Sequence, residues 1–202
     1  MIPKLSNISF KSIPIYDVKV KKKEGSVYKN VDATFSRLNP YDNKDAAAIN
    51  KIRKQWGVSG YTEEITNNFK HPGVADLFFA IELKGDEPLH KRIVSISETC
   101  PSMPSHHIDF LQSRPKNYLD IKEGDIKGGG EVMLYGIIKA SKVNCFDRVN
   151  LRSTYRSVDF YKHVGFSSEE DERTCMELKN SDFDSYIKRV EEKYGFNQEE
   201  EQ

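Results

Sequence analysis

Three successive glycines, Gly128, Gly129 and Gly130, lead directly into the apolar run over residues 132–138. Apolar side chains recur near helical spacing over residues 131–144, so this stretch predicts a helix. A glycine turn at a helix N-terminus leaves backbone N–H groups pointing forward, and these groups together with the helix dipole favour an anion. Taken alone, the glycines are also compatible with a flexible loop that binds nothing.

The residues around this turn exclude two common phosphate-binding motifs. No Gly-Lys-Ser/Thr follows at the offset of a P-loop, and the dinucleotide fingerprint Gly-x-Gly-x-x-Gly is not met. The residues that follow predict a strand over 147–153, then a helix capped by Ser153 or Thr154 and ended by Gly165, and a further strand from Phe166. The order is therefore glycine turn, helix, strand, helix, strand.

Two segments of this region resemble the signatures of the GNAT superfamily of N-acetyltransferases. Residues 127–134, Lys-Gly-Gly-Gly-Glu-Val-Met-Leu, resemble its acyl-CoA signature Arg/Gln-x-x-Gly-x-Gly/Ala. Residues 157–166 resemble its second signature, Asn-x-x-Ala-x-x-Phe-Tyr-x-x-x-Gly-Phe. Three positions depart from the pattern, because Lys127 replaces Arg or Gln, Val132 replaces the second small residue, and Thr154 replaces the Asn.

The resemblance implies an α/β (α+β) fold with a mixed, mostly antiparallel central sheet, flanking helices and a splayed central strand pair. It also implies transfer of an acetyl group from acetyl-CoA, used as a co-substrate, to an amine acceptor in a ternary complex. A catalytically degenerate module that binds acyl-CoA or a protein is the alternative, because Val132 would crowd the pyrophosphate and the signature Asn is replaced. The sequence does not identify the acceptor as a small amine, a protein or an aminoacylated RNA.

Tyr161 stands at the tyrosine of the second signature, and the resemblance implies that it is the general acid for the leaving thiolate. A phenol is neutral at pH 7 and can donate a proton over a short distance. The alternative is a packed helix aromatic. Backbone N–H groups near Leu111 would bind the oxyanion of the tetrahedral intermediate. The cofactor contacts implied by the resemblance are Leu111, Gln112, Ser113, Lys127, Gly128, Gly129, Gly130, Glu131, Val132, Thr154, Ser157 and Phe160.

An ammonium group cannot attack a thioester, so the acceptor must lose a proton to a base. Glu98, at the end of a predicted strand, is the candidate for this catalytic role. Glu82, His106 and His107 are the further alternatives, and each is also compatible with an ordinary strand or surface position. A chain of water molecules would replace them all.

The elements that would position these residues follow from alternation, helical spacing and turn signals. Asp42 or Asn43 can cap the first helix, and Trp56 belongs to its core-facing side. Tyr61, just before the second helix, and Phe69, within it, either line an acceptor wall or pack in the core. The predicted strands are 33–38, 77–83, 92–98, 107–112 and 173–178, the predicted helices are 43–56, 62–71 and 180–195, and the loops are 84–90, 100–107 and 116–127.

The chain divides into an N-terminal extension over residues 1–32, a GNAT-like domain over 33–178, and a C-terminal helix with an acidic tail over 179–202. In the extension, a strand over 13–20 and a lysine-rich turn over 21–25 predict a hairpin at the sheet edge, where lysines discourage further pairing. The alternative is a basic contact for an acidic partner.

The composition is that of a polar globular protein, with 37% hydrophobic and 31% charged side chains among 202 residues, the size of one domain. Basic and acidic side chains number 31 each, which argues against a general nucleic-acid binder. No apolar run reaches the length of a membrane span, and the N-terminal segment has no signal core, so a cytoplasmic protein is expected. A homodimer is left open.

Three cysteines, Cys100, Cys145 and Cys175, form an odd number without metal-ligand spacing, which fits a reduced, cytoplasmic setting. His, Cys, Asp and Glu do not cluster at metal-ligand spacing, so no metal is expected. Cys145 is expected to be buried and His90 to lie on the surface.

Overall fold

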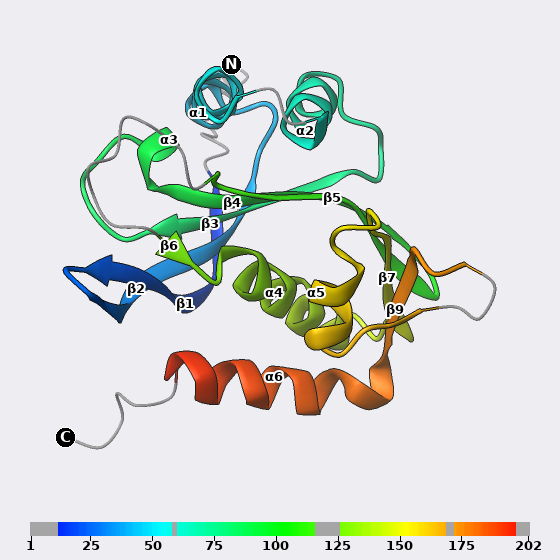
Figure 1. Cartoon of the computed structure of the whole chain (residues 1–202). Coiled ribbons are helices and arrows are strands. Elements are labelled where there is room, and N and C mark those ends of the chain that lie inside the picture. Colours follow the sequence, from blue (N-terminus) through cyan, green and yellow to red (C-terminus); the bar gives the residue numbers. More distant parts are fainter. Residues whose placement is uncertain (1–11, 58–59, 116–125, 169–171, 197–202) are drawn as a thin grey trace, which may run out of the picture.

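The computed structural model describes residues 12–57, 60–115, 126–168 and 172–196 of the chain. Over these residues the strands form one sheet in the order β6-β1-β2-β3-β4-β5-β7-β9-β8 (Figure 1). Neighbouring strands are antiparallel except for β5 and β7, which are parallel. Helices α1 and α2 cover one face, and α4 and α6 lie on the other (Figure 1). The predicted mixed, mostly antiparallel sheet flanked by helices is confirmed.

The elements follow one another in the order expected from the sequence, with α3 and β6 as additions. The strands are β1 (Ile13–Glu24), β2 (Val27–Leu38), β3 (Leu77–Leu83), β4 (Ile93–Ser102), β5 (Ser105–Ser113), β6 (Ile126–Lys127), β7 (Arg148–Arg152), β8 (Ser167–Ser168) and β9 (Cys175–Lys179). The helices are α1 (Asn43–Gln55), α2 (Gly60–Lys70), α3 (Leu89–Arg92), α4 (Gly129–Val143), α5 (Val158–His163) and α6 (Asn180–Tyr194).

The N-terminal hairpin of β1 and β2 is longer than the sequence predicts. Its ladder continues to the pair of Glu24 and Val27, so residues predicted as a lysine-rich turn lie in a strand. Val18 and Val20 are buried in the core that β1 shares with α4, which makes the hairpin part of that core. The two residues of β6 pair with β1 on its outer side, so the hairpin lies next to the sheet edge rather than at it.

Strands β4 and β5 form a continuous hairpin where the sequence predicts a loop over residues 100–107. Their ladder runs through Thr99 and Ile108 to the last pair, Ser102 and Ser105. The prediction of a loop was wrong because two prolines suggested a break, whereas the paired backbone continues past them. His106 and His107 consequently lie within β5 instead of preceding it.

Strands β5 and β7 separate part-way along their length. They pair from Ser105 and Arg148 to Ile108 and Leu151, whereas β5 continues to Ser113 with β4 as its neighbour. The predicted splayed central pair is confirmed. The edge of β5 beyond Ile108 is therefore left open on the β7 side, next to the N-terminus of α4.

Helix α4 is enclosed between the sheet and α6, which explains its continuous apolar sequence. Gly136 lies against β2, where an added Cβ would come within 2.4 Å of the Phe35 ring. A glycine is needed here because the helix packs directly on that ring. The apolar residues of α4 with no exposed surface are Val132, Met133, Leu134, Ile137 and Ile138.

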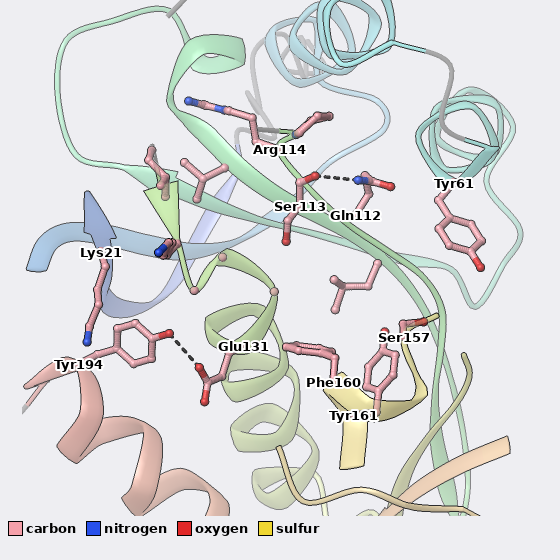
Figure 2. A pocket seen from close by; sticks show the side chains of 18 of the residues that line it. Lys21, Tyr61, Gln112, Ser113, Arg114, Glu131, Ser157, Phe160, Tyr161 and Tyr194 are labelled. Atoms are coloured by element: carbon pink, nitrogen blue, oxygen red, sulfur yellow. Dashed lines mark hydrogen bonds between the residues drawn. The ribbon is translucent and has the colours of Figure 1, made fainter. Parts of the chain in front are cut away.

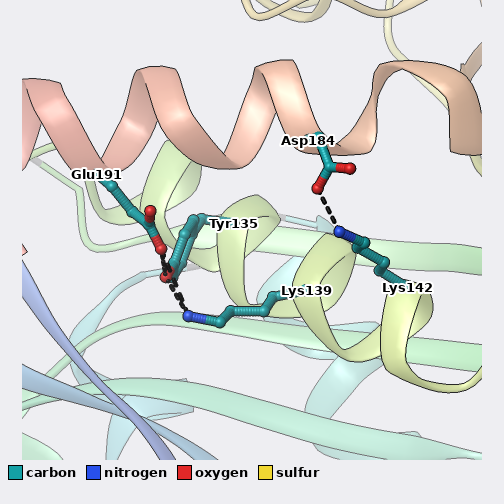
Figure 3. A network of polar contacts seen from close by, with 5 residues as sticks. All are labelled: Tyr135, Lys139, Lys142, Asp184 and Glu191. Carbon is teal, nitrogen blue, oxygen red and sulfur yellow. Dashed lines mark hydrogen bonds and ion pairs between the residues drawn. The ribbon is translucent and has the colours of Figure 1, made fainter.

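Polar side chains join α4 to α6 (Figure 3). The Tyr135 hydroxyl donates to Glu191 Oε1 at 2.7 Å, and Lys139 Nζ donates to that hydroxyl oxygen at 2.8 Å. Tyr135 is 1% exposed, so its hydroxyl requires a partner inside the protein. Further along the helices, Lys142 forms an ion pair with Asp184. These contacts hold α6 across the length of α4.

Three local predictions about helix ends and the core are confirmed. Asp42 caps α1, because its side chain accepts hydrogen bonds from the N–H groups of Lys44 and Asp45. Trp56 is 5% exposed and belongs to the core between α1, α2 and the sheet. Helix α6 ends at Gly195, which has a φ of 65°.

Other local predictions were wrong. Helix α5 begins only at Val158, because Ser157 and Thr154 bond to each other through their hydroxyls at 2.8 Å instead of capping an earlier turn. Cys145 is exposed in the turn after α4. His90 is 8% exposed, because the short helix α3 holds it against the body of the protein.

Some predictions fall on parts of the chain outside the described residues. These are the loop over 116–125, the start of the extension over 1–11 and the acidic tail over 197–202. In the described part of the chain, no helix is both long and apolar enough to cross a membrane. The same residues contain no group of three or more His, Cys, Asp or Glu side chains that could hold a metal ion.

Candidate active site

A cavity of about 830 Å³ lies where the N-terminus of α4 meets β5, α5 and the end of α6 (Figure 2). It brings Tyr161 together with most of the predicted cofactor contacts. Val132 and Glu98 are the predicted site residues that do not line it. The predicted contacts in its wall are Leu111, Gln112, Ser113, Lys127, Gly128, Gly129, Gly130, Glu131, Thr154, Ser157 and Phe160.

The glycine turn lies at the N-terminus of α4, as its sequence predicts. Gly128 is the N-cap and has a φ of 88°, a conformation that residues with a Cβ rarely adopt. The first helical hydrogen bond runs from the Val132 N–H to the Gly128 carbonyl at 2.8 Å. The N–H groups of Gly129, Gly130 and Glu131 therefore precede the helical ladder, and with the helix dipole they favour an anion.

The glycines keep the cavity open at this turn. An added Cβ on Gly130 would lie 3.2 Å from Ser113 Oγ, and one on Gly129 would lie 3.2 Å from the Val94 carbonyl oxygen. Side chains at these positions would crowd Val94 and Ser113 in the cavity wall. The resulting cradle of bare backbone fits a pyrophosphate, which is bound by N–H groups at helix N-termini in other folds.

Val132 does not crowd this cradle, contrary to the expectation from its position in the signature. Its side chain is 0% exposed and belongs to the core around α4. Its backbone N–H is the donor of the first helical hydrogen bond. The substitution of a small residue by valine is accommodated because this position faces the core and not the cavity.

Glu131 is a buried carboxylate in the cavity wall, with 7% of its surface exposed. Its Oε2 accepts hydrogen bonds from Lys193 Nζ at 2.6 Å and from the Tyr194 hydroxyl at 2.9 Å (Figure 2). A buried charge is costly unless it is paired and hydrogen-bonded. The last turn of α6 therefore compensates a negative charge that would otherwise oppose an anion at the glycine turn.

The same end of the cavity is rich in cations. Lys21, Arg114 and Lys127 line it together with Lys193. Lys127 Nζ lies 4.1 Å from the centroid of the Tyr28 ring, and Lys21 Nζ lies 5.7 Å from that of Tyr194. Four cations and the one carboxylate of Glu131 line this end, so it favours a ligand with several negative charges.

Sequence reasoning missed Lys21, Arg114, Lys193 and Tyr194 as members of the site. Lys21 was assigned to a turn, and no motif marks the other three. They lie on three different segments of the chain, namely β1, the residue after β5 and the last turn of α6, so only the tertiary structure brings them together.

The opposite end of the cavity is aromatic (Figure 2). Tyr161 is 9% exposed, and burial raises the pKa of its phenol to about 12, with a smaller contribution from Tyr61. The phenol therefore keeps its proton at neutral pH. Phe160 packs edge-on against Tyr161 with 5.1 Å between ring centroids. Of the two aromatic wall candidates on α2, Tyr61 lines the cavity, whereas Phe69 is buried in the core.

Glu98 lies in β4 and faces α2, outside the cavity wall. Its side chain is 3% exposed, and both carboxylate oxygens accept hydrogen bonds from Asn68 Nδ2, at 2.9 and 3.0 Å. Burial raises the pKa of Glu98 to about 7, although the Asn68 hydrogen bond opposes this shift and nearby carboxylates add to it. The structure does not place Glu98 beside Tyr161.

The alternative bases also lie outside this cavity. His106 is buried, with Nδ1 2.7 Å from Ser141 Oγ and Nε2 2.9 Å from Thr99 Oγ1, and burial lowers its pKa to about 4. His107 lines a separate cavity of about 280 Å³ between β5 and β7. Glu82 is buried beside Arg92, with 3.7 Å between their charged groups.

Comparisons with known proteins bear on the fold. No family model matches the sequence, and no curated protein matches it. A protein from Desulfovibrio desulfuricans assigned to the GNAT acetyltransferase family matches in three dimensions with a TM-score of 0.53 and 11% identity, over 73% of this chain and 99% of that one. The chain has the GNAT fold.

Two further solved structures with similar folds contain a bound cofactor. The AtaT toxin, in a mutant form bound to the C-terminus of the antitoxin AtaR and acetyl-CoA, matches with a TM-score of 0.55 and 12% identity, over 82% of this chain and 99% of that one. The PaiA N-acetyltransferase from Thermoplasma acidophilum, in complex with coenzyme A, matches with a TM-score of 0.50 and 16% identity, over 73% of this chain and 98% of that one.

The GNAT fold accounts for the position of the cavity in this chain. The splay of β5 from β7 leaves Leu111, Gln112 and Ser113 without a strand neighbour on one side, and these residues line the cavity wall. The glycine turn at the start of α4 lies directly against them, because Gly130 approaches Leu111 and Ser113. An extended ligand can therefore lie along β5 with its anionic part at the glycine turn.

Proposed function

We propose that this chain is an N-acetyltransferase that moves an acetyl group from acetyl-CoA directly to an amine acceptor. The observation that carries the proposal is one continuous cavity with the glycine turn at one end and Tyr161 at the other. A single ligand can contact anion-binding N–H groups and a proton-bearing phenol at the same time. The GNAT fold supports the proposal, as do the coenzyme A bound to PaiA and the acetyl-CoA bound to AtaT.

In this proposal the N–H groups of Gly129, Gly130 and Glu131 bind the pyrophosphate. Lys21 and Lys127 lie at the same end and offset its charge. The open edge of β5 offers backbone hydrogen-bonding groups to the amides of the pantetheine arm, as an edge strand does for an added strand. Acetyl-CoA supplies the thioester, and these residues orient it toward Tyr161.

The proposed role of Tyr161 is to give its proton to the leaving sulfur when the carbon–sulfur bond breaks. A phenol at its ordinary pKa of about 10 is protonated throughout the neutral range, and burial raises the pKa of Tyr161 further, to about 12. A backbone N–H near Leu111 is proposed to bind the oxyanion that forms beforehand. Both groups act in a partly enclosed site, where a fixed donor is worth more than in water.

Glu98 remains the proposed base, acting through water because it does not line the cavity. Its pKa of about 7 suits proton transfer at neutral pH. The pH profile of kcat/KM in wild type should then lose activity below about pH 7, and Glu98→Gln should remove this acidic limb together with most of the rate. An unchanged profile in the variant would assign the acidic limb to the acceptor amine instead.

A module that binds acyl-CoA without catalysis is the second candidate. Thr154 in place of the signature Asn favours it, whereas the position of Val132 in the core removes the other argument for it. The two candidates differ in turnover and not in affinity, so binding alone cannot separate them.

The deciding experiment incubates the full chain with acetyl-CoA and a panel of acceptors, namely small amines, protein N-termini and aminoacylated RNA. Release of CoA is followed with a thiol reagent. Acceptor-dependent release supports the enzyme. A rise in melting temperature with acetyl-CoA but no release with any acceptor supports the binding module, and the lack of both responses rejects the two candidates together.

A further inference from the structure

A β-bulge in β5 lies near the point where β5 and β7 separate. The ladder between β4 and β5 shifts register between Glu98 and Thr99, and Asp109 is left without a partner on β4. Bulges of this kind re-aim side chains and are common beside active sites. The Phe110 ring packs against Tyr61 of α2, with 5.7 Å between ring centroids. Asp109 contributes to the raised pKa of Glu98, so it also lies near the face of the sheet that α2 covers.

The cavity of about 280 Å³ between β5 and β7, here called the small cavity, lies beside this bulge. Ile108 and Leu151, the last pair between the two strands, line it. Asn150 lines it as well, and its side-chain oxygen Oδ1 is buried without a hydrogen-bond partner in the described part of the chain. A buried oxygen of this kind is then satisfied only by a donor from a ligand or from water. The remaining polar residues of the wall are His107, Asp109, Arg152 and Cys175.

Carboxylates gather next to the small cavity. Burial raises the pKa of Glu98 most, three carboxylates add to the shift, and no lysine or arginine of the described residues opposes it. These carboxylates belong to Asp76, Asp109 and Glu64. Partial burial likewise raises the pKa of Asp109, which His107 opposes and Asp76 reinforces. Carboxylates with raised pKa values lack a compensating cation, so a cation that enters here is bound favourably.

The arginine in the wall of the small cavity is engaged with a different carboxylate. Arg152 Nη2 lies 2.9 Å from Glu172 Oε1 and 3.9 Å from Cys175 Sγ. The positive charge of Arg152 is therefore offset outside the group of carboxylates around Asp109. The charges at the small cavity favour a cation over an anion.

The small cavity and the large one lie close together along β5. Asp109 lines the first and Leu111 lines the second, and the two residues are about 7 Å apart along the strand. The edge of β5 has no strand neighbour on the β7 side over this stretch, because the pairing ends at Ile108. A short linear chain with a nitrogen at each end can therefore place one nitrogen near Tyr161 and the other beside Asp109.

We propose that the acceptor is a linear aliphatic amine with a second ammonium group, and that the small cavity binds this second group. The inference rests on the proposed function and deepens it, because it names the class of acceptor. The second ammonium donates hydrogen bonds to the Asp109 carboxylate and to Asn150 Oδ1. At the other end, the free amine nitrogen bonds to the acetyl carbon and loses a proton to the base, and the sulfur leaves with the proton of Tyr161. The products are the acetamide and coenzyme A.

The test compares kcat/KM of the full chain for linear diamines of increasing length with kcat/KM for the monoamine of the same carbon chain. Acetyl-CoA is saturating, and release of CoA is followed with a thiol reagent. At the best length, wild type should prefer the diamine by on the order of tenfold or more, because the second ammonium gains charge-assisted hydrogen bonds. Asp109→Asn and Asn150→Ala should each bring this ratio toward one. Asn150→Asp keeps the oxygen and adds a negative charge, so it should raise the ratio.

A control variant and the wild type itself can overturn the inference. Asp182→Asn removes the same charge at an exposed position in the first turn of α6, so it should keep the ratio, and a melting curve checks that each variant is folded. A ratio near one at every length in wild type rejects the second ammonium site and leaves the proposed function intact. A preference that survives both Asp109→Asn and Asn150→Ala also rejects this site. Transfer to protein N-termini or aminoacylated RNA but to no aliphatic amine rejects the diamine alone, whereas transfer to no acceptor rejects the proposed function as well.

Discussion

The two ends of the large cavity are built from different groups. At the glycine turn, backbone N–H groups of α4 meet four cations and the paired carboxylate of Glu131. At the other end, the rings of Tyr61, Phe160 and Tyr161 line the space, and burial raises the pKa of the Tyr161 phenol to about 12. In the proposed function, the first end supplies positive charge for a phosphate, and the second end supplies a protonated phenol.

This difference separates affinity from turnover. A ligand group bound equally in the ground state and the transition state changes affinity, whereas a proton donated only in the transition state changes kcat. Variants at the glycine turn should therefore alter the dissociation constant of acetyl-CoA, and variants at the aromatic end should alter kcat. The predictions below test this division.

Tyr161→Phe should give the largest effect and act on turnover. The variant keeps the ring and its packing but has no proton to donate, so kcat should fall by about 10²–10⁴-fold. The dissociation constant of acetyl-CoA should be unchanged by calorimetry. Tyr155→Phe, at a tyrosine that is 82% exposed, is the matched control and should keep full activity. Full turnover in Tyr161→Phe at every pH would leave Tyr161 with a packing role only.

Gly130→Asp should abolish binding at the other end. In wild type, acetyl-CoA at about 100 times its dissociation constant should stabilise the protein by roughly 2.7 kcal/mol. For a domain of this size this raises the melting temperature by about 5–10 °C. The aspartate brings a negative charge and a Cβ that would lie 3.2 Å from Ser113 Oγ, so the shift should disappear.

The control for this substitution is Gly60→Asp. Gly60 begins α2, and an added Cβ there meets no atom within 4 Å, so the variant adds the same charge at a helix start outside the cavity. It should keep the full thermal shift. A normal shift in Gly130→Asp would keep the ligand but place its pyrophosphate away from this turn.

Glu98 lies outside both ends of the cavity, and Glu98→Gln should change the dependence of stability on pH. The folded pKa is raised to about 7 from an ordinary 4.5, so the folded chain holds a proton that the unfolded chain releases. The contribution of Glu98 to the free energy of unfolding is therefore fully present below about pH 4.5 and is lost as the pH rises to about 7. The variant should therefore gain several degrees in melting temperature over wild type between about pH 5 and pH 8. A difference that does not vary with pH would show that Glu98 is ionised throughout.

Tyr194→Phe should give the smallest change in ligand binding, and it should act only at the glycine turn. Glu131 loses one of its two partners, which costs about 1.5–3 kcal/mol in the free energy of unfolding and leaves more negative charge facing the phosphates. Acetyl-CoA should bind several-fold more weakly, with kcat at saturation unchanged. Tyr186→Phe is the matched control, because the Tyr186 hydroxyl donates to the Glu131 backbone carbonyl and not to its carboxylate. Equal losses of affinity in both variants would reduce the effect of Tyr194 to general loosening of α6.

Most of the predictions that the structure confirms depend on residues that are close together in the sequence. A short apolar run predicts β3, which is buried on both faces, and helical spacing predicts α4. Gly165 and Gly195 end helices because a left-handed residue is required there. Cys145 was misassigned because burial of a turn residue depends on which other segment covers it.

The sequence by itself determined the glycine turn, the helix that follows it and the phenol of the second signature, because each depends on backbone geometry and spacing over a few residues. Only the tertiary structure decided that Lys193 forms an ion pair with Glu131 and that Tyr194 donates a hydrogen bond to it. It also decided that Lys21 reaches the cavity and that Glu98 faces α2. Those positions follow from strand register and from the packing of α6 on α4, which join residues far apart in the chain. Such contacts depend on burial and charge pairing over the whole fold, so they cannot be predicted from the pattern of neighbouring residues in the sequence.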